Sequence, residues 1–269
     1  MDHAVRDGTT PRVGLTHLAL AVGGFAIGTT EFATMSLLPD FARDLGIDSP
    51  TAGHVISAYA LGVVVGAPLI AVATARMARR TLLIMLMGLF AIANALSGIA
   101  PSYHWMLFFR FLSGLPHGAY FGIATLVAAR LVARDKRTQA VARVLLGLTV
   151  ATIVGVPAAN WLGQAVGWRW CFAVVAGLAA ATALLVALFA PRDSADRQAS
   201  ALRELSALAQ PQVWMTLGIG AIGFGGLFAV YTYLADTMTH VTGASPVMVP
   251  FALMAFGVEL NMYAFVGII

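Results

Sequence analysis

Charged residues are scarce in this sequence of 269 residues. Asp, Glu, Lys and Arg together make up 10% of it, whereas ordinary soluble domains contain about 25%. Hydrophobic residues make up 59%, and they form runs of roughly 20 residues rather than short alternating segments. The composition therefore predicts an all-α integral membrane protein in a lipid bilayer. The net charge of +4 comes from loops and gives no reason to expect a nucleic-acid partner.

Lysine and cysteine are almost absent. Lys136 is the only lysine and lies in a loop, which excludes a retinal protein, because its Schiff base needs a lysine inside a helix. Cys171 is the only cysteine, so an internal disulfide is excluded. No glycine-rich loop with a lysine is present to bind nucleotide phosphates, which argues against direct coupling to ATP. Ser113 and His117 lie on one helix without a partner from a second, which argues against a serine protease. We expect no enzyme activity, no cofactor and no metal, and a channel stays open as an alternative.

The hydrophobic runs predict eight transmembrane helices. The leader before the first run is polar, and that run is too long and too rich in glycine for a cleaved signal peptide, so we expect a retained helix. The predicted spans are residues 15–38, 52–75, 81–99, 105–129, 140–161, 170–189, 213–234 and 247–269.

The basic residues are distributed unevenly between the predicted loops. Only Arg43 and Arg169 fall on one side, and Arg110 lies within a span. Cytoplasmic loops carry an excess of Lys and Arg, so we expect a cytoplasmic N-terminus in the inner (plasma) membrane. The other thirteen of the sixteen basic residues fall on the predicted cytoplasmic side: Arg6, Arg12, Arg76, Arg79, Arg80, Arg130, Arg134, Lys136, Arg137, Arg143, Arg192, Arg197 and Arg203.

A polar segment at residues 191–211 separates six predicted spans from two. The predicted organisation is a cytoplasmic N-terminus at 1–14, a six-helix bundle at 15–190, a cytoplasmic linker at 191–211 and an incomplete second bundle at 212–269. A weak repeat supports this division, because Phe32 and Asp40 recur as Phe228 and Asp236 at the same offset. Parallel six-helix repeats are the plan of one large transporter fold.

Three ionisable side chains inside the predicted spans are candidates for proton coupling. Arg110 lies near the start of the fourth span. A charge costs about 2.5–3.5 kcal/mol at the bilayer centre and less nearer the interface. Glu31 lies deep in the first span, where a carboxylate is expected to be protonated or paired. His117 follows Arg110 by two helical turns and could carry a proton near neutral pH. For each of the three, the alternative is a purely structural bond between helices.

Glycines and aromatic residues suggest how the helices pack. Gly114, Gly118 and Gly122 form one stripe, which predicts close approach of a neighbouring helix. Glu259 and Asn261 in the last span have no evident partner. Five tryptophans at span ends are predicted to anchor the membrane interface: Trp105, Trp161, Trp168, Trp170 and Trp214. Five other aromatic residues are candidates for lining a binding cavity, with packing as the alternative: Phe25, Phe32, Tyr59, Tyr120 and Phe228.

Several motifs resemble the major facilitator superfamily, and within it the bacterial drug:proton antiporters related to the sugar and arabinose efflux group. The first span reads Gly-Gly-Phe-Ala-Ile-Gly-Thr-Thr-Glu-Phe at 23–32, and the second leads to Ala-Arg-Met-Ala-Arg-Arg at 75–80. The fourth carries Arg110 and His-Gly at 117–118, and the fifth carries Gly147 and Gly-Val-Pro at 155–157. The resemblance implies a proton-coupling role for Arg110 and an acidic residue such as Glu31 in the first helix.

Two motifs depart from the family pattern. Arg76, Arg79 and Arg80 resemble its cytoplasmic gate loop, but Ala75 stands where the family has an aspartate, so the carboxylate half of that gate is missing. Gly155 and Pro157 resemble the antiporter helix, with Val156 between them, and predict a bend with close packing. An ordinary proline kink is the alternative at this second motif.

Length is the main difficulty for the resemblance, because the family fold has twelve helices and this chain has eight predicted ones. We expect either a truncated, non-transporting fragment or a half-transporter that needs a second chain. The function that the resemblance implies is proton-coupled efflux of a drug-like or sugar-like small molecule by alternating access.

Overall fold

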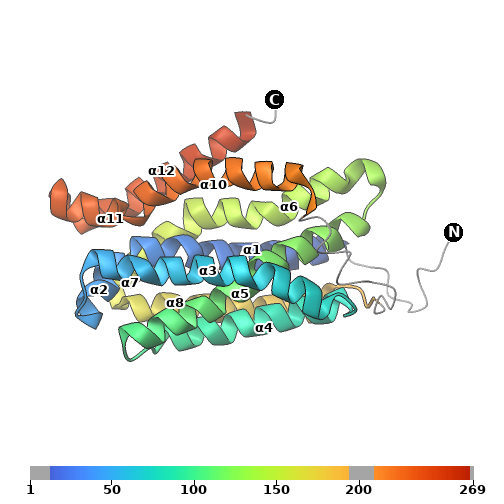
Figure 1. Ribbon diagram of the computed structural model, residues 1–269, viewed down its shortest axis with the longest axis horizontal. Coiled ribbons are helices and arrows are strands. Elements are labelled where there is room, and N and C mark those ends of the chain that lie inside the picture. Colours follow the sequence, from blue (N-terminus) through green and yellow to red (C-terminus); the bar gives the residue numbers. More distant parts are fainter. Residues whose placement is uncertain (1–12, 194–208, 267–269) are drawn as a thin grey trace.

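The structure is a computed structural model, and it describes residues 13–193 and 209–266. Within these ranges the fold is all-helical, as predicted (Figure 1). Arg6, Arg12, Arg197 and Arg203 of the topology prediction lie outside the described residues. The first part of the chain forms α1 (Val13–Ser36), α2 (Leu38–Leu45), α3 (Ser49–Thr74), α4 (Arg79–Gly98), α5 (Tyr103–Arg130) and the short η1 (Arg134–Lys136).

The fifth predicted span is one long helix with a change of winding inside it. It consists of α6 (Arg137–Val150), the π-helical turn η2 (Ala151–Gly155) and α7 (Val156–Val166). The remaining elements are α8 (Trp168–Phe189), α10 (Pro211–Thr232), α11 (Leu234–Asp236), η4 (Thr237–Val241), η5 (Pro246–Met248) and α12 (Val249–Val266).

Seven helices among the described residues are long and apolar enough to cross a membrane, and they match the first seven predicted spans. The eighth prediction is met in part: Pro246–Asn261 is apolar but falls among the shorter helices. The division of the chain into two bundles and a linker stays a prediction.

Local signals in the sequence explain where several helices begin and end. Asp48 caps α3, because its side chain accepts a hydrogen bond from the Thr51 amide (2.9 Å). Gly46 ends α2 with a φ of 67°, a left-handed conformation that glycine adopts without strain. Gly167 makes the turn between α7 and α8 in a different conformation (φ 105°, ψ 145°), and its positive φ also favours glycine.

The helices pack around α1. The main neighbours of this helix are α6 and α8, while α5 packs against α3 and α4, and α4 packs against α8. Gly62 on α3 faces Gly114 on α5 so closely that a Cβ at Gly62 would lie 3.1 Å from the Gly114 Cα. Gly118 also packs against α3, which confirms two positions of the predicted glycine stripe. The prediction for Gly122 is wrong, because a Cβ there would meet nothing within 4 Å.

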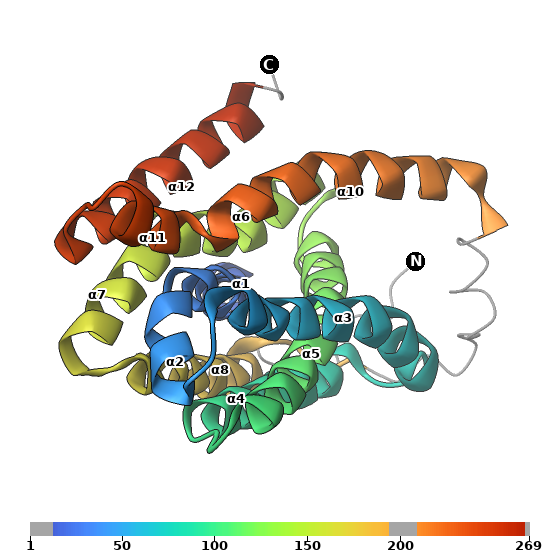
Figure 2. The ribbon, with the colours of Figure 1, turned by 60° about the vertical axis from the view of Figure 1, so that its left-hand side comes forward.

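The bundle has two distinct ends. We call the end that carries α2 and α11 the α2 end, and the end that carries η1 and the start of α4 the η1 end (Figure 1). The last helices lie along one side of the bundle (Figure 2), where α12 packs against η2 and α7. By contrast, Tyr231 is the only buried residue of α10, so nearly all of that helix presents its surface outward.

Candidate functional site

Arg110 lies inside the protein rather than against lipid. Its side chain is 1% exposed, and Nη1 donates hydrogen bonds to Thr30 Oγ1 (3.3 Å) and Ser113 Oγ (3.4 Å). The guanidinium carbon lies 4.2 Å from the centre of the Tyr59 ring and 5.7 Å from that of Phe172. A cation over an aromatic face is attracted by the ring quadrupole. Arg110 therefore sits where α1, α3, α5 and α8 meet, held by neutral groups.

Thr30 is held in place by a second polar side chain that the sequence did not single out. Thr30 Oγ1 donates to Asn94 Oδ1 (2.9 Å), and Asn94 Nδ2 donates to the carbonyl of Phe90 (2.8 Å). A hydroxyl has one proton, so a threonine that donates to Asn94 must offer a lone pair to Arg110. Thr30 and Asn94 are 2% and 0% exposed. The chain of bonds therefore fixes the direction of the Arg110 side chain from α4.

Glu31 lies one residue after Thr30 and interacts electrostatically with Arg110 and Tyr59. No hydrogen bond or ion pair to its carboxylate is found among the residues that the structure describes. A carboxylate and a guanidinium inside one bundle are therefore near enough to influence each other without being paired. This arrangement leaves the carboxylate available to a proton or a cationic group.

His117 joins the same cluster through Tyr59. The Tyr59 hydroxyl and His117 Nδ1 form a hydrogen bond of 2.8 Å, and their ring centres are 5.7 Å apart. Tyr59 is 3% exposed and contacts Arg110 with its ring face. The structure thus brings Glu31, Arg110 and His117 together. Tyr59, predicted as a cavity-lining residue, is the link between two of them.

The other candidate cavity residues lie in three different settings. Phe25 lines an open groove of about 520 Å³ between α1 and α6, together with Gly147 and, toward the η1 end, His17 and Arg143. Tyr120 is fully buried and donates to the carbonyl of Leu20 (2.7 Å), so it fastens α5 to α1. The groove walls are mostly apolar, as expected of a site for a small organic molecule.

Phe32 and Phe228 stack on each other across α1 and α10, with ring centres 5.6 Å apart. Tyr231 meets the Phe32 ring edge-on at 5.4 Å and the Phe256 ring of α12 at 4.9 Å. We call Phe32, Phe228, Tyr231 and Phe256 the aromatic cluster. It connects the first helix to the last two helices.

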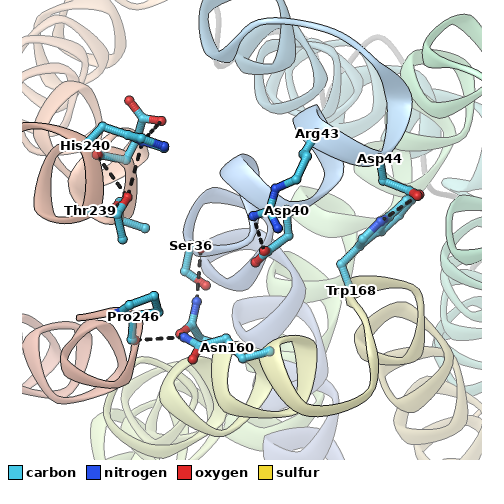
Figure 3. Close-up of polar contacts among 12 residues, drawn as sticks. Ser36, Asp40, Arg43, Asp44, Asn160, Trp168, Thr239, His240 and Pro246 are labelled. Atoms are coloured by element: carbon cyan, nitrogen blue, oxygen red, sulfur yellow. Dashed lines mark hydrogen bonds and ion pairs between the residues drawn. The ribbon is translucent and has the colours of Figure 1, made fainter. Parts of the chain in front are cut away.

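Polar contacts join several helices at the α2 end (Figure 3). Asn160 of α7 donates to the Ser36 carbonyl (3.0 Å). Ser49 at the start of α3 donates to Asp236 of α11 (2.8 Å), and Gln164 donates to the Pro246 carbonyl (3.0 Å). The last helices are therefore fastened to the first part of the chain at this end.

Asp44 connects α2 to the start of α8 at the same end. It pairs with Arg169 and accepts a hydrogen bond from Trp168 Nε1 (3.1 Å) (Figure 3). The Arg169 hydrogen bond holds the pKa of this carboxylate below its ordinary value. The prediction that Trp168 anchors the membrane interface is wrong, because it is 4% exposed and packs on Phe41.

The antiporter-type helix, where the sequence predicted a bend, changes its winding at the π turn η2. Gly155 lies in this turn with Thr29 and Phe25 of α1 against it, and Pro157 lies in the first turn of α7. Proline has no amide hydrogen, so it tolerates the shift in hydrogen-bond register that a π turn makes. Gly147, one turn before η2, packs against the α1 backbone, where a Cβ would lie 2.9 Å from the Phe25 nitrogen.

Asn261 is bonded to this same helix, which corrects the expectation that it lacks a partner. Its Oδ1 accepts from Thr149 (2.8 Å), and its Nδ2 donates to Thr152 (3.0 Å) and to the Gly257 carbonyl (2.7 Å). Gly257 itself packs against the Thr152 carbonyl, and a Cβ there would collide with it. By contrast, Glu259 is exposed.

The gate-loop arginines lie at the η1 end. The backbone amides of Arg79 and Arg80 donate to the carboxylate of Asp193 (2.8 and 3.2 Å), and Arg79 Nη1 lies 3.8 Å from it. Asp193, which follows α8, thus brings a carboxylate to this loop, where Ala75 provides none. Arg76 is exposed. The sequence could not reveal this contact, since the partners are more than a hundred residues apart.

Comparisons of the sequence with known proteins agree on one protein family. The family profile described as Major Facilitator Superfamily matches residues 20–269. The inner membrane transport protein YdhP of Escherichia coli (strain K12) is 43% identical over 250 residues, which cover 93% of this chain and 64% of YdhP. A chloramphenicol resistance protein of Streptomyces lividans is 38% identical, over 88% of this chain and 62% of the relative. This chain thus spans less than two thirds of their length.

Solved structures share the fold. A bacterial homolog of the human lysosomal transporter Spinster, in an inward-facing and unoccupied conformation, superimposes with a TM-score of 0.71 at 19% identity. The match covers 94% of this chain and 60% of that one. A D-xylose-proton symporter gives a TM-score of 0.69 at 18% identity, over 95% of this chain and 68% of the symporter.

Proposed function

Since this chain belongs to the major facilitator superfamily of multi-pass membrane transporters, we propose that it takes part in proton-coupled efflux of a small molecule by alternating access. It is a transporter-family protein rather than an enzyme. Glu31 is the proton-carrying group in this proposal, Arg110 modulates its charge, and His117 extends the network toward α3 through Tyr59.

The observation that carries the proposal is that Glu31 and Arg110 interact electrostatically without forming an ion pair in the described part of the chain. The two residues interact electrostatically, but neutral partners hold Arg110, and no ion pair with Glu31 is found within the described part of the chain. A permanent salt bridge would keep the carboxylate ionised and make it unable to carry a proton. A carboxylate near but not bonded to a cation can exchange a proton for a substrate and return.

The two ends of the bundle support alternating access. The groove beside Phe25 reaches the η1 end at His17 and Arg143, whereas the aromatic cluster and the Ser49–Asp236 bond close the α2 end. The excess of Lys and Arg at the η1 end assigns it to the cytoplasm in this proposal. The arrangement is then inward-facing, and export would require opening of the aromatic cluster.

The substrate class follows from the walls of the groove. They are mostly apolar, with Phe25 on one side and Arg143 at the rim. Such a surface suits an amphipathic, drug-like molecule better than a fully hydroxylated sugar, which needs many hydrogen-bonding partners. One relative is named for chloramphenicol resistance, which supports the same class.

The exposed surface of α10 indicates that a complete transporter needs further helices. Tyr231 is its only buried residue, whereas helices of a complete bundle bury at least one face. We infer that further helices cover α10 and close the groove, either in a longer form of the chain or in a second chain. If the chain by itself is a non-transporting fragment, it sustains no substrate-dependent proton movement. Flux through a channel would show no proton dependence.

The test compares two carboxylates in everted membrane vesicles that carry the protein in its longest natural form. Chloramphenicol and a pentose serve as probes, and a pH-sensitive dye reports proton release. Glu31→Gln keeps the shape of the side chain and removes its titration, so it is expected to abolish substrate-induced release. Glu259→Gln removes an exposed carboxylate and is expected to leave the release unchanged. Release at the wild-type rate in Glu31→Gln would show that Glu31 is not the coupling residue.

A further inference from the structure

A second, smaller pocket lies at the η1 end, away from the coupling cluster. It has a volume of about 110 Å³, large enough for several water molecules. The walls come from the start of α4, the end of α5 and the segment after α8. They are formed by Arg79, Arg80, Val127, Arg130, Leu131, Ala190, Pro191 and Asp193.

The pocket has an excess of positive charge. Three arginines line it with one carboxylate, and that carboxylate already accepts hydrogen bonds from the Arg79 and Arg80 amides. Arg80 donates to the Ala187 carbonyl, and its buried Nε has no partner within residues 13–193 and 209–266. Among the residues that the structure describes, the Arg130 guanidinium makes no hydrogen bond or ion pair. The cationic groups therefore retain capacity to bind an anion.

The other walls of the pocket are apolar. Val127, Leu131 and Pro191 stand beside the arginines, at the level where the hydrophobic stretches of α4, α5 and α8 begin or end. That level is the boundary between lipid headgroups and acyl chains. A hollow with guanidinium groups on one side and aliphatic groups on the other matches a molecule with an anionic head and an apolar body.

We propose that this pocket binds the phosphate of an anionic membrane lipid. Guanidinium groups bind phosphate oxygens with charge-assisted, often bidentate hydrogen bonds, and basic pockets between transmembrane helices bind lipid headgroups of this kind. The lipid would join the ends of α4, α5 and α8, with its glycerol and first acyl carbons on Val127 and Leu131. A free phosphate ion shares the anionic chemistry but would make no use of the apolar walls.

The experiment titrates the detergent-purified protein with short-chain phosphatidylglycerol and counts bound lipids by native mass spectrometry. Phosphatidylcholine and inorganic phosphate are titrated in parallel. Arg130→Gln is the principal variant, because Arg130 makes no described bond whose loss would disturb folding. Arg79→Gln is the second variant, and it retains the backbone bond to Asp193. Arg76→Gln removes the same charge from the same end of the bundle but lies outside the pocket, so it serves as the matched control.

A basic residue near an anionic surface contributes about 1 kcal/mol, which corresponds to roughly a fivefold change in affinity. Arg130→Gln and Arg79→Gln should each weaken phosphatidylglycerol binding about fivefold, while Arg76→Gln and phosphatidylcholine should show no such dependence. Equal weakening by Arg76→Gln would overturn the proposal, because the effect would then come from general surface charge. Displacement of phosphatidylglycerol by an equal concentration of inorganic phosphate would also overturn it, in favour of a site for free anions.

Discussion

Replacing Thr30 by valine tests whether the neutral bonds around Arg110 hold it in place. Valine has nearly the same shape as threonine but no hydroxyl, so Thr30→Val removes the bonds to Arg110 (3.3 Å) and Asn94 (2.9 Å) together. Both partners are buried and would be left with one bond fewer. Leaving a buried group unsatisfied costs about 1–3 kcal/mol, whereas hydrogen bonds between membrane helices average about 0.6 kcal/mol. Because one of the two bonds is long, we expect a loss of about 1–2 kcal/mol in the free energy of unfolding.

The assay is thermal unfolding of the detergent-purified protein. For a chain of this size, a loss of about 1 kcal/mol lowers Tm by roughly 2–4 °C, so Thr30→Val should lower it by about 2–8 °C. Thr34→Val is the matched control. Thr34 is also buried on α1, one turn further on, but among the described residues its hydroxyl bonds only to the Thr30 carbonyl within the same helix (2.6 Å). Thr34→Val should therefore lower Tm clearly less than Thr30→Val does.

A double variant distinguishes the bond itself from loss of packing. Thr30→Val and Asn94→Leu both break the Thr30–Asn94 bond. The double variant should therefore lose less free energy of unfolding than the sum of the losses in the two single variants. Two results would refute the view that α4 positions Arg110 through Thr30. One is strict additivity of the losses in free energy of unfolding, and the other is an equal loss in Thr30→Val and Thr34→Val.

Two further predictions concern helix packing. Gly62→Ala would place a Cβ against the α5 backbone and should lower the free energy of unfolding by about 1–3 kcal/mol in the same thermal assay. Gly122→Ala, with nothing within 4 Å, should be neutral, and equal losses in the two variants would contradict the packing described here. Asn261→Leu should detach α12 from the π turn by removing bonds worth about 0.6 kcal/mol each. Faster amide hydrogen exchange in η2 would reveal this change, and unaltered exchange would count against a clamp at Asn261.

Much of the fold was predictable because the relevant signals are local. A run of apolar residues must form a helix in a bilayer wherever it packs, since no water satisfies its backbone groups. The fifth span shows where such local reasoning ends. Gly155 and Pro157 predicted a bend, whereas the structure has a π turn there that contacts α1 and α12. The partners of Asn261 were also hidden, because hydropathy gives the length of a helix but not its rotation.

Some residues of the candidate site were likewise predictable from the sequence, and others were not. Glu31, Arg110 and His117 could be singled out from the sequence because an ionisable group in an apolar stretch is costly wherever it points. Thr30 and Asn94 could not, since hydroxyl and amide groups are common in membrane helices, where many bond to their own backbone. Asp193 could not be singled out for a different reason. Many loop carboxylates follow a transmembrane helix as Asp193 does, and only folding brings it to the start of α4.

The sequence by itself determined that this is a helical membrane protein of the transporter type, with ionisable groups within its first and fourth predicted spans. Those conclusions depend on composition and on residues near one another in the chain. The tertiary structure alone decided that Arg110 rests on neutral partners and that Asn261 bonds to α6 and η2. Residues 64 to 112 positions apart meet in these contacts, and which of them meet is set by how each helix is rotated and packed.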